Sequence, residues 1–102
     1  LHSGTDFGIP CGTPVYATAA GTVLSAGWGG GYGNRITIDH GIQRGVDLVT
    51  TYNHLSSILV HSGDVRRGQL IGYAGTTGYS TGCHLHFETL EDGSFVNPRT
   101  WI

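Results

Sequence analysis

Residues 35–54, RITIDHGIQRGVDLVTTYNH, decide the fold of this chain. Apolar and polar side chains alternate in the opening segment, so Ile36 and Ile38 face the same side of an extended backbone. Residues 46–54 are rich in valine, threonine, leucine and tyrosine, which favour strands. The glycines that bound residues 41–45 indicate a turn. The stretch therefore predicts two strands that pair with each other.

The rest of the chain repeats this pattern of short strands and glycine-rich turns. We expect strands at residues 15–17 and 22–24, paired as a hairpin around Ala20-Gly21, and further strands at residues 70–74 and 84–90. No stretch has the period of a helix. The predicted class is all-β, a compact antiparallel β-sandwich or partly closed barrel, formed as a single domain over residues 1–102.

Composition excludes several classes of function. The chain has 102 residues, of which 12% are charged, and a net charge of −2. All its cations are arginines, and apart from the Arg66-Arg67 pair they are scattered, so the sequence lacks the basic footprint of a nucleic-acid binder. No apolar run is long enough to cross a membrane, so we expect no membrane insertion. Nothing suggests an apolar interface, so we expect a monomer.

Cys11 and Cys83 are the two cysteines of the chain. An even pair in a small glycine-rich domain permits one disulfide and favours an oxidising compartment. Such a bridge would close a loop of most of the chain and contribute about 4 kcal/mol to stability. The alternative is that one or both thiolates bind a metal.

Two short motifs carry the chemistry: HSGTD at residues 2–6 and HLHFE at residues 84–88. His84 and His86 are two apart, so on a strand they point to the same face, and His2 and Asp6 also share one side of an extended segment. Histidine and carboxylate suit Zn²⁺, and a catalytic zinc takes three protein ligands and keeps one position open. The motifs predict a divided zinc site that the fold must bring together.

Further residues accompany this site. His54 ends the predicted strand over residues 46–54, and with it the chain has more histidines than a zinc with three ligands needs. One interpretation is that His54 and His84 are not ligands but transfer protons beside the metal. Glu88 shares the strand face of His84 and His86, so it is either a hydrogen-bonding partner of a ligand or a solvated residue.

A series of motifs in this chain resembles one known family. They occur in order and cover essentially the whole sequence: HSGTD (2–6), GTPVYA (12–17), GN (33–34), HG (40–41), YNHL (52–55), GDVRRGQLIG (63–72), and GTTGYSTG (75–82) followed by HLHFE. The chain closely resembles the catalytic domain of the lysostaphin-type zinc endopeptidases, the M23 or LytM-like family.

The resemblance implies a compact antiparallel β domain with a groove over a zinc ion. By motif match, the zinc ligands fall on His2, Asp6 and His86, and the two catalytic histidines that do not bind zinc fall on His54 and His84. Family members cleave peptide bonds in the stem peptides or cross-bridges of peptidoglycan. This implies an extracytoplasmic site of action, in the periplasm, the cell wall or the medium, or an enzyme carried by a phage. Many members have proline where this chain has Cys83.

Several residues also have simpler interpretations. We expect His40 to make structural hydrogen bonds at a hairpin end and His61 to lie on the surface. Tyr32, Tyr52 and Tyr79 either pack or line a groove for substrate, and the glycine loop over residues 29–33 either flanks that groove or only turns. The alternative function is a non-catalytic relative that binds the cell wall or activates another protein, although such members usually lack ligands that are present here.

Overall fold

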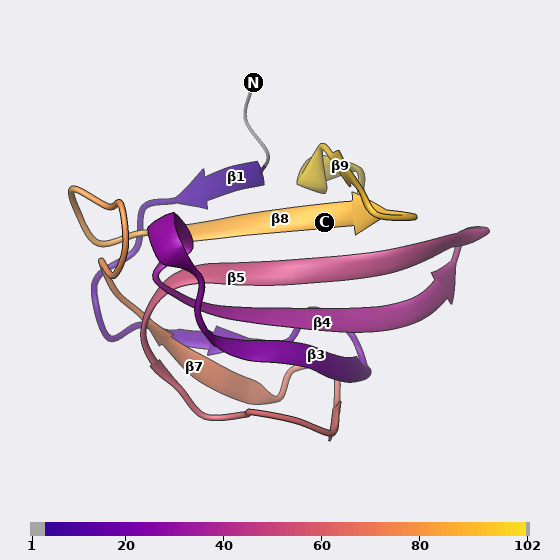
Figure 1. Ribbon diagram of the computed structural model, residues 1–102, viewed down its shortest axis with the longest axis horizontal. Helices are drawn as coiled ribbons and strands as arrows, with labels where there is room; N and C mark the ends of the chain where they lie inside the picture. The colour runs from indigo at the N-terminus through magenta and orange to yellow at the C-terminus, as the bar shows by residue number, and fades with distance from the viewer. Residues whose placement is uncertain (1–3, 102) are drawn as a thin grey trace.

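A single antiparallel sheet organises the computed structural model, which describes residues 4–101 (Figure 1). The strands are β1 (Gly4–Phe7), β2 (Pro14–Tyr16), β3 (Gly21–Trp28), β4 (Asn34–Gln43), β5 (Val46–Ile58), β6 (Asp64–Val65), β7 (Leu70–Ala74), β8 (Leu85–Glu91) and β9 (Ser94–Val96). Two short 3₁₀ turns complete the described chain, η1 (Gly30–Tyr32) and η2 (Pro98–Thr100).

The sheet branches at β5. Its strands run in the order β1-β8-β5-β4-β3-β6, while β9 adds to β8 and the β2–β7 pair joins β5. One edge of β5 pairs with β8 as far as Asn53 and with β7 from Leu55 onward. The long strands β3, β4, β5 and β8 form one layer, and β7 runs obliquely to them (Figure 1). The predicted all-β antiparallel class is confirmed, and the sheet is not closed.

The core explains the register of the central strands. Ile36 and Ile38 of β4 are fully buried, as the alternation predicts, and they pack in one cluster with Tyr52 and Leu55 of β5 and Phe87 of β8. Each such side chain stabilises the fold by about 1.5–3 kcal/mol. A shift of one residue would turn every inward side chain outward, so the register of β4 is strongly specified.

One predicted pairing is wrong. Residues 15–17 and 22–24 do not form a hairpin: Val15 pairs with Gly72 in β7, whereas β3 pairs with β4 and β6. The strands themselves are where the sequence placed them. Short strands with apolar centres fit several partners, and the choice depends on contacts distant in sequence. The predicted β4–β5 hairpin is confirmed, with both strands longer than expected.

A disulfide joins Cys11 to Cys83, so the predicted bridge is confirmed and the alternative of thiolate ligands is wrong. It links the segment after β1 to the segment before β8. Gly4 of β1 pairs with Glu88 of β8, and a Cβ there would lie 2.3 Å from the carbonyl oxygen of Phe87. Glycine is thus required for β1 to lie this close to β8.

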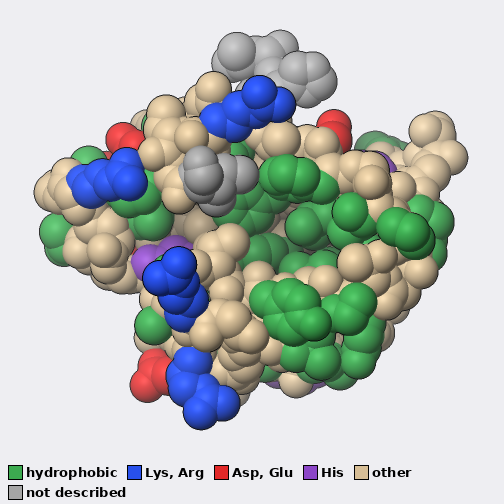
Figure 2. All heavy atoms as spheres, turned by 180° about the vertical axis from the view of Figure 1, so that it is seen from behind, with side chains coloured by type: hydrophobic (Ala, Val, Ile, Leu, Met, Phe, Trp, Pro, Cys, Tyr) green, Lys and Arg blue, Asp and Glu red, His purple; other side chains and the backbone are tan. Residues whose placement is uncertain are grey.

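Hydrophobic side chains gather around a hollow on the face opposite to that of Figure 1 (Figure 2). The structure has an apolar pocket of about 300 Å³ lined by side chains that include Phe7, Tyr16, Leu85 and Phe87. Among the described residues, those that line this pocket include no histidine, acid or cysteine. Within residues 4–101 no helix has the length and hydropathy needed to cross a membrane.

Candidate metal centre and catalytic pocket

Strand register brings Asp6 and His86 together. The two residues are direct partners in the β1–β8 pair, and Asn53 of β5 lies opposite His86 on its other side. Side chains of such partners are close neighbours on one face of a sheet. Asp6 Oδ1 lies 2.8 Å from His86 Nδ1, although the two residues are far apart in the sequence. The two halves of the divided site therefore meet, as the motifs predict.

The next row on the same face holds Glu88. It pairs with Gly4 on one side and Thr51 on the other, and its side chain is fully buried. Glu88 Oε1 accepts hydrogen bonds from Thr51 Oγ1 at 2.7 Å and Arg35 Nη2 at 3.1 Å, while Oε2 lies 3.3 Å from His86 Nε2. The interpretation of Glu88 as a hydrogen-bonding partner of His86 is thus confirmed, and the solvated one is wrong.

His54 reaches the site through a local change in β5. It lies between the part of β5 that pairs with β8 and the part that pairs with β7, and its φ of 62° is in the left-handed region. This conformation is unfavourable for residues other than glycine, and such strain is often found at functional sites. His54 Nδ1 lies 2.6 Å from the carbonyl oxygen of Thr77. A carbonyl only accepts, so Nδ1 carries a hydrogen and the neutral ring keeps its lone pair on Nε2.

His84 is held in a similar way just before β8. Its Nδ1 lies 2.9 Å from the carbonyl oxygen of Gly82 and 3.0 Å from Ser80 Oγ. Its Nε2 lies 3.5 Å from Asp6 Oδ1. The rings of His54 and His84 are 4.7 Å apart between centroids. Two histidines therefore lie side by side, each with Nδ1 fixed by a backbone oxygen.

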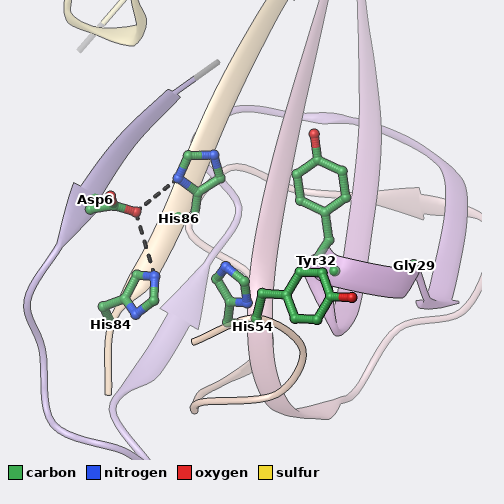
Figure 3. A pocket seen from close by; sticks show the side chains of 8 residues that line it. Asp6, Gly29, Tyr32, His54, His84 and His86 are labelled. Carbon is green, nitrogen blue, oxygen red and sulfur yellow. Dashed lines mark hydrogen bonds and ion pairs between the residues drawn. The ribbon is translucent and has the colours of Figure 1, made fainter. Parts of the chain in front are cut away.

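These side chains share one open pocket of about 400 Å³ (Figure 3). Asp6 comes from β1, His86 from β8, His84 from the residue just before β8 and His54 from β5, while Tyr32 and Gly29 come from the loop around η1 (Figure 3). Tyr79 and Gly31 complete the lining. The glycine loop therefore flanks the pocket, which the sequence left open as one of two interpretations.

The donor set fits a zinc ion. A carboxylate oxygen and an imidazole nitrogen face each other, which are ligands that Zn²⁺ accepts. The hydrogen bond to Glu88 raises the pKa of His86, opposed by burial, and the hydrogen bond to Asp6 raises it further. Among the described residues, the buried Asn53 Oδ1 in the same row has no hydrogen-bond partner. The predicted ligand His2 lies outside the described residues, and within residues 4–101 no three side chains form a complete metal site.

The other residues considered in the sequence analysis are either structural, exposed or part of the pocket lining. His40 is buried, with Nδ1 2.8 Å from the Ala20 oxygen and Nε2 2.7 Å from Thr50 Oγ1, so its structural role is confirmed. His61 is exposed, as expected. Tyr32 and Tyr79 line the pocket, whereas Tyr52 packs in the core.

Sequence reasoning missed the part that Arg35, Thr51 and Thr77 play at the site. Arg35 and Thr51 contact Glu88, and the Thr77 oxygen holds His54. Alternation places Arg35 on the face opposite Ile36, which is the available signal, but it does not show which strand lies alongside.

Comparison with known proteins adds the family. Residues 1–98 match the sequences described as Peptidase family M23. The chain belongs to this family. It is 46% identical over 97 residues to the peptidoglycan DD-endopeptidase ShyA of Vibrio cholerae. The matched region covers 94% of this chain but only 22% of ShyA. The M23 domain here thus spans about a fifth of the length of that relative.

Solved structures agree with the M23 assignment. The catalytic domain of the antimicrobial peptidase lysostaphin from Staphylococcus simulans superposes with a TM-score of 0.88 at 38% identity, covering 99% of this chain and 78% of that one. A zinc-containing peptidase from Vibrio cholerae superposes with a TM-score of 0.84 at 46% identity, covering 93% of this chain and 28% of that one. The predicted resemblance is therefore confirmed.

Proposed function

We propose that this M23 domain is a zinc metalloendopeptidase that cleaves peptide bonds in the stem peptides or cross-bridges of bacterial peptidoglycan. The observation that carries the proposal is the Asp6–His86 pair beside two histidines whose Nδ1 atoms are anchored on backbone oxygens. The names of two similar proteins, a peptidoglycan DD-endopeptidase and a zinc-containing peptidase, support the substrate class and the metal.

His2, Asp6 and His86 are the residues that would hold the zinc. Zinc bound by three protein ligands polarises a carbonyl oxygen and lowers the pKa of a bound water to around 7. Glu88 fixes the orientation of His86 by contacting Nε2, so that Nδ1 faces Asp6. A carboxylate behind a ligand histidine also makes the imidazole a stronger base and thus a better ligand.

His54 and His84 are the residues that would move protons. With Nδ1 bonded to a backbone oxygen, each neutral ring keeps a lone pair on Nε2, which can accept a proton from the attacking water. The protonated ring can then return this proton to the leaving amine or stabilise the negative charge of the tetrahedral intermediate. Their separation of 4.7 Å between ring centroids allows both to act on one peptide bond.

The walls of the pocket suit a slim peptide. Gly29 and Gly31 line the pocket without adding side chains to it, and Tyr32 and Tyr79 contribute aromatic rings to its lining. Action on peptidoglycan takes place outside the cytoplasm, and the exposed Cys11–Cys83 disulfide suits an oxidising compartment. We propose that the domain acts there as a monomer.

The test is digestion of purified peptidoglycan with the released fragments analysed by mass spectrometry. Wild-type protein should release fragments cut within the peptide portion, a chelator should stop the release, and added zinc should restore it. His84→Ala should remove cleavage while thermal unfolding shows that the fold is retained. His61→Ala, which changes an exposed histidine away from the pocket, is the matched control and should cleave normally.

Full activity of a folded His84→Ala variant would contradict the catalytic assignment. A protein that holds one zinc per chain but leaves peptidoglycan intact would instead favour the alternative of a non-catalytic domain that binds the wall or a partner.

A further inference from the structure

Arg35 of β4 connects two walls of the candidate pocket. Its guanidinium carbon lies 3.9 Å from the centre of the Tyr32 ring, and Nη2 donates to Glu88 Oε1 at 3.1 Å. The side chain of Arg35 is only 21% exposed. Tyr32 lines the pocket, and Glu88 lies behind it without contact with solvent. One side chain therefore touches both the substrate wall and the buried carboxylate.

Arg35, Glu88, His86 and Tyr32 form a closed ring of contacts beside the pocket. From Glu88 the path continues to His86 Nε2 at 3.3 Å, and the His86 ring lies 6.4 Å from the Tyr32 ring with an interplanar angle of 27°. Tyr32 in turn lies under Arg35. Tyr32 belongs to η1, a short turn between glycines that has no buried residue, so its own element does little to fix the ring. Arg35 supplies that support from the sheet.

We propose that Arg35 is a positioning residue that holds Glu88 against His86 and at the same time holds the Tyr32 ring as a wall of the substrate pocket. The inference rests on the proposed function, because it assigns His86 to the zinc and the pocket to the peptide. Arg35 contacts neither the zinc nor the peptide directly. It acts through the direction of His86 Nδ1 and through the shape of the pocket.

The chemistry of arginine suits both contacts at once. A guanidinium is planar, so its face can lie on an aromatic ring while the N–H groups at its edge donate to a carboxylate. A lysine ammonium has no such face and would serve one contact at the expense of the other. Arg35 is also the cation beside Glu88, whose buried carboxylate is costly without one.

The test compares Arg35→Met and Arg35→Lys with a matched control, Arg44→Met. Arg44 makes the same kind of contacts away from the pocket: its guanidinium carbon lies 4.3 Å from the Trp101 ring, and Nη1 donates to the Thr100 oxygen at 2.9 Å. Zinc affinity is measured on metal-free protein by competition with a chromophoric chelator. The kcat and KM are measured with a soluble peptidoglycan fragment.

Arg35→Met should weaken zinc binding about 10-fold or more, as loss of a contact behind a metal ligand does. It should also raise KM roughly three-fold because the Tyr32 ring loses its support. Arg35→Lys keeps a cation beside Glu88, so it should recover most of the zinc affinity while KM stays raised. Arg44→Met should change neither quantity.

Arg35→Met removes the guanidinium that lies against the buried Glu88 carboxylate, which lowers the stability of that variant and its yield of folded protein. Arg35→Met/Glu88→Gln removes the carboxylate as well and should fold, with KM raised as in Arg35→Met, whereas Glu88→Gln alone keeps Arg35 on the Tyr32 ring and should leave KM near the wild-type value. A KM within two-fold of wild type in both the double variant and Arg35→Lys would overturn the inference. A wild-type protein that binds no zinc and cleaves nothing would overturn the proposed function itself, and the inference with it.

Discussion

Removing the Cys11–Cys83 disulfide should lower the stability of the fold by an amount that follows from the length of chain it closes. The two residues are 72 apart in the sequence, and the loop-entropy relation gives about 4 kcal/mol for a loop of this length. Both cysteines are exposed, so replacing them with alanine opens no cavity in the core. For a domain of this size the loss corresponds to a decrease in Tm of roughly 15–20 °C.

The assay is thermal unfolding of Cys11→Ala/Cys83→Ala against wild type, followed by far-UV circular dichroism. Wild-type protein reduced with a phosphine is the control, because it loses the same constraint without any substitution and should unfold at nearly the same temperature as the variant. A decrease below about 5 °C in both samples would refute the reasoning. It would mean that the unfolded chain is already compact without the bridge.

Three further predictions test other parts of the structure. Gly33→Ala places a Cβ 2.4 Å from the backbone of Thr77, so it should displace the Thr77 carbonyl oxygen that holds His54 and thereby reduce kcat. The control is Gly41→Ala, because Gly41 has a similar positive φ but no atom near the position of the added Cβ, so this variant should reduce only stability. Ile38→Ala should lower the free energy of unfolding in urea by about 2–5 kcal/mol, because the side chain is fully buried. The hydrogen bond to Asp39 raises the pKa of Asp47 above its ordinary value of 3.8, so the stabilising contribution of the Asp47 proton is lost as pH rises through that raised pKa. Asp47→Asn should therefore gain stability relative to wild type as the pH of urea unfolding is raised from acid to neutral.

Local pattern was enough to predict the central strands and one face of the site. Alternation at Ile36 and Ile38 gave the inward face of β4, and the spacing of His84 and His86 placed both on one face of the sheet. These inferences hold because a strand has a fixed period of two, whatever it pairs with.

Pairing between distant strands could not be predicted in the same way. The partner of β2 is β7 and not β3, and β9 has only three residues, too few for a clear period. Glu88 was recognised as a possible partner of His86, but its burial depends on Gly4 and Thr51, which lie on neighbouring strands. Arg35 reaches the same row only because β4 lies beside β5.

Zinc bound per chain is the most direct test of the central claim, that β1 and β8 together present Asp6 and His86 to a metal. Metal analysis of purified protein should find one zinc in wild type and close to none in Asp6→Ala and in His86→Ala, with circular dichroism showing a retained fold. His61→Ala should keep its zinc. Stoichiometric zinc in both folded variants would contradict the account, because the metal would then be held by other residues.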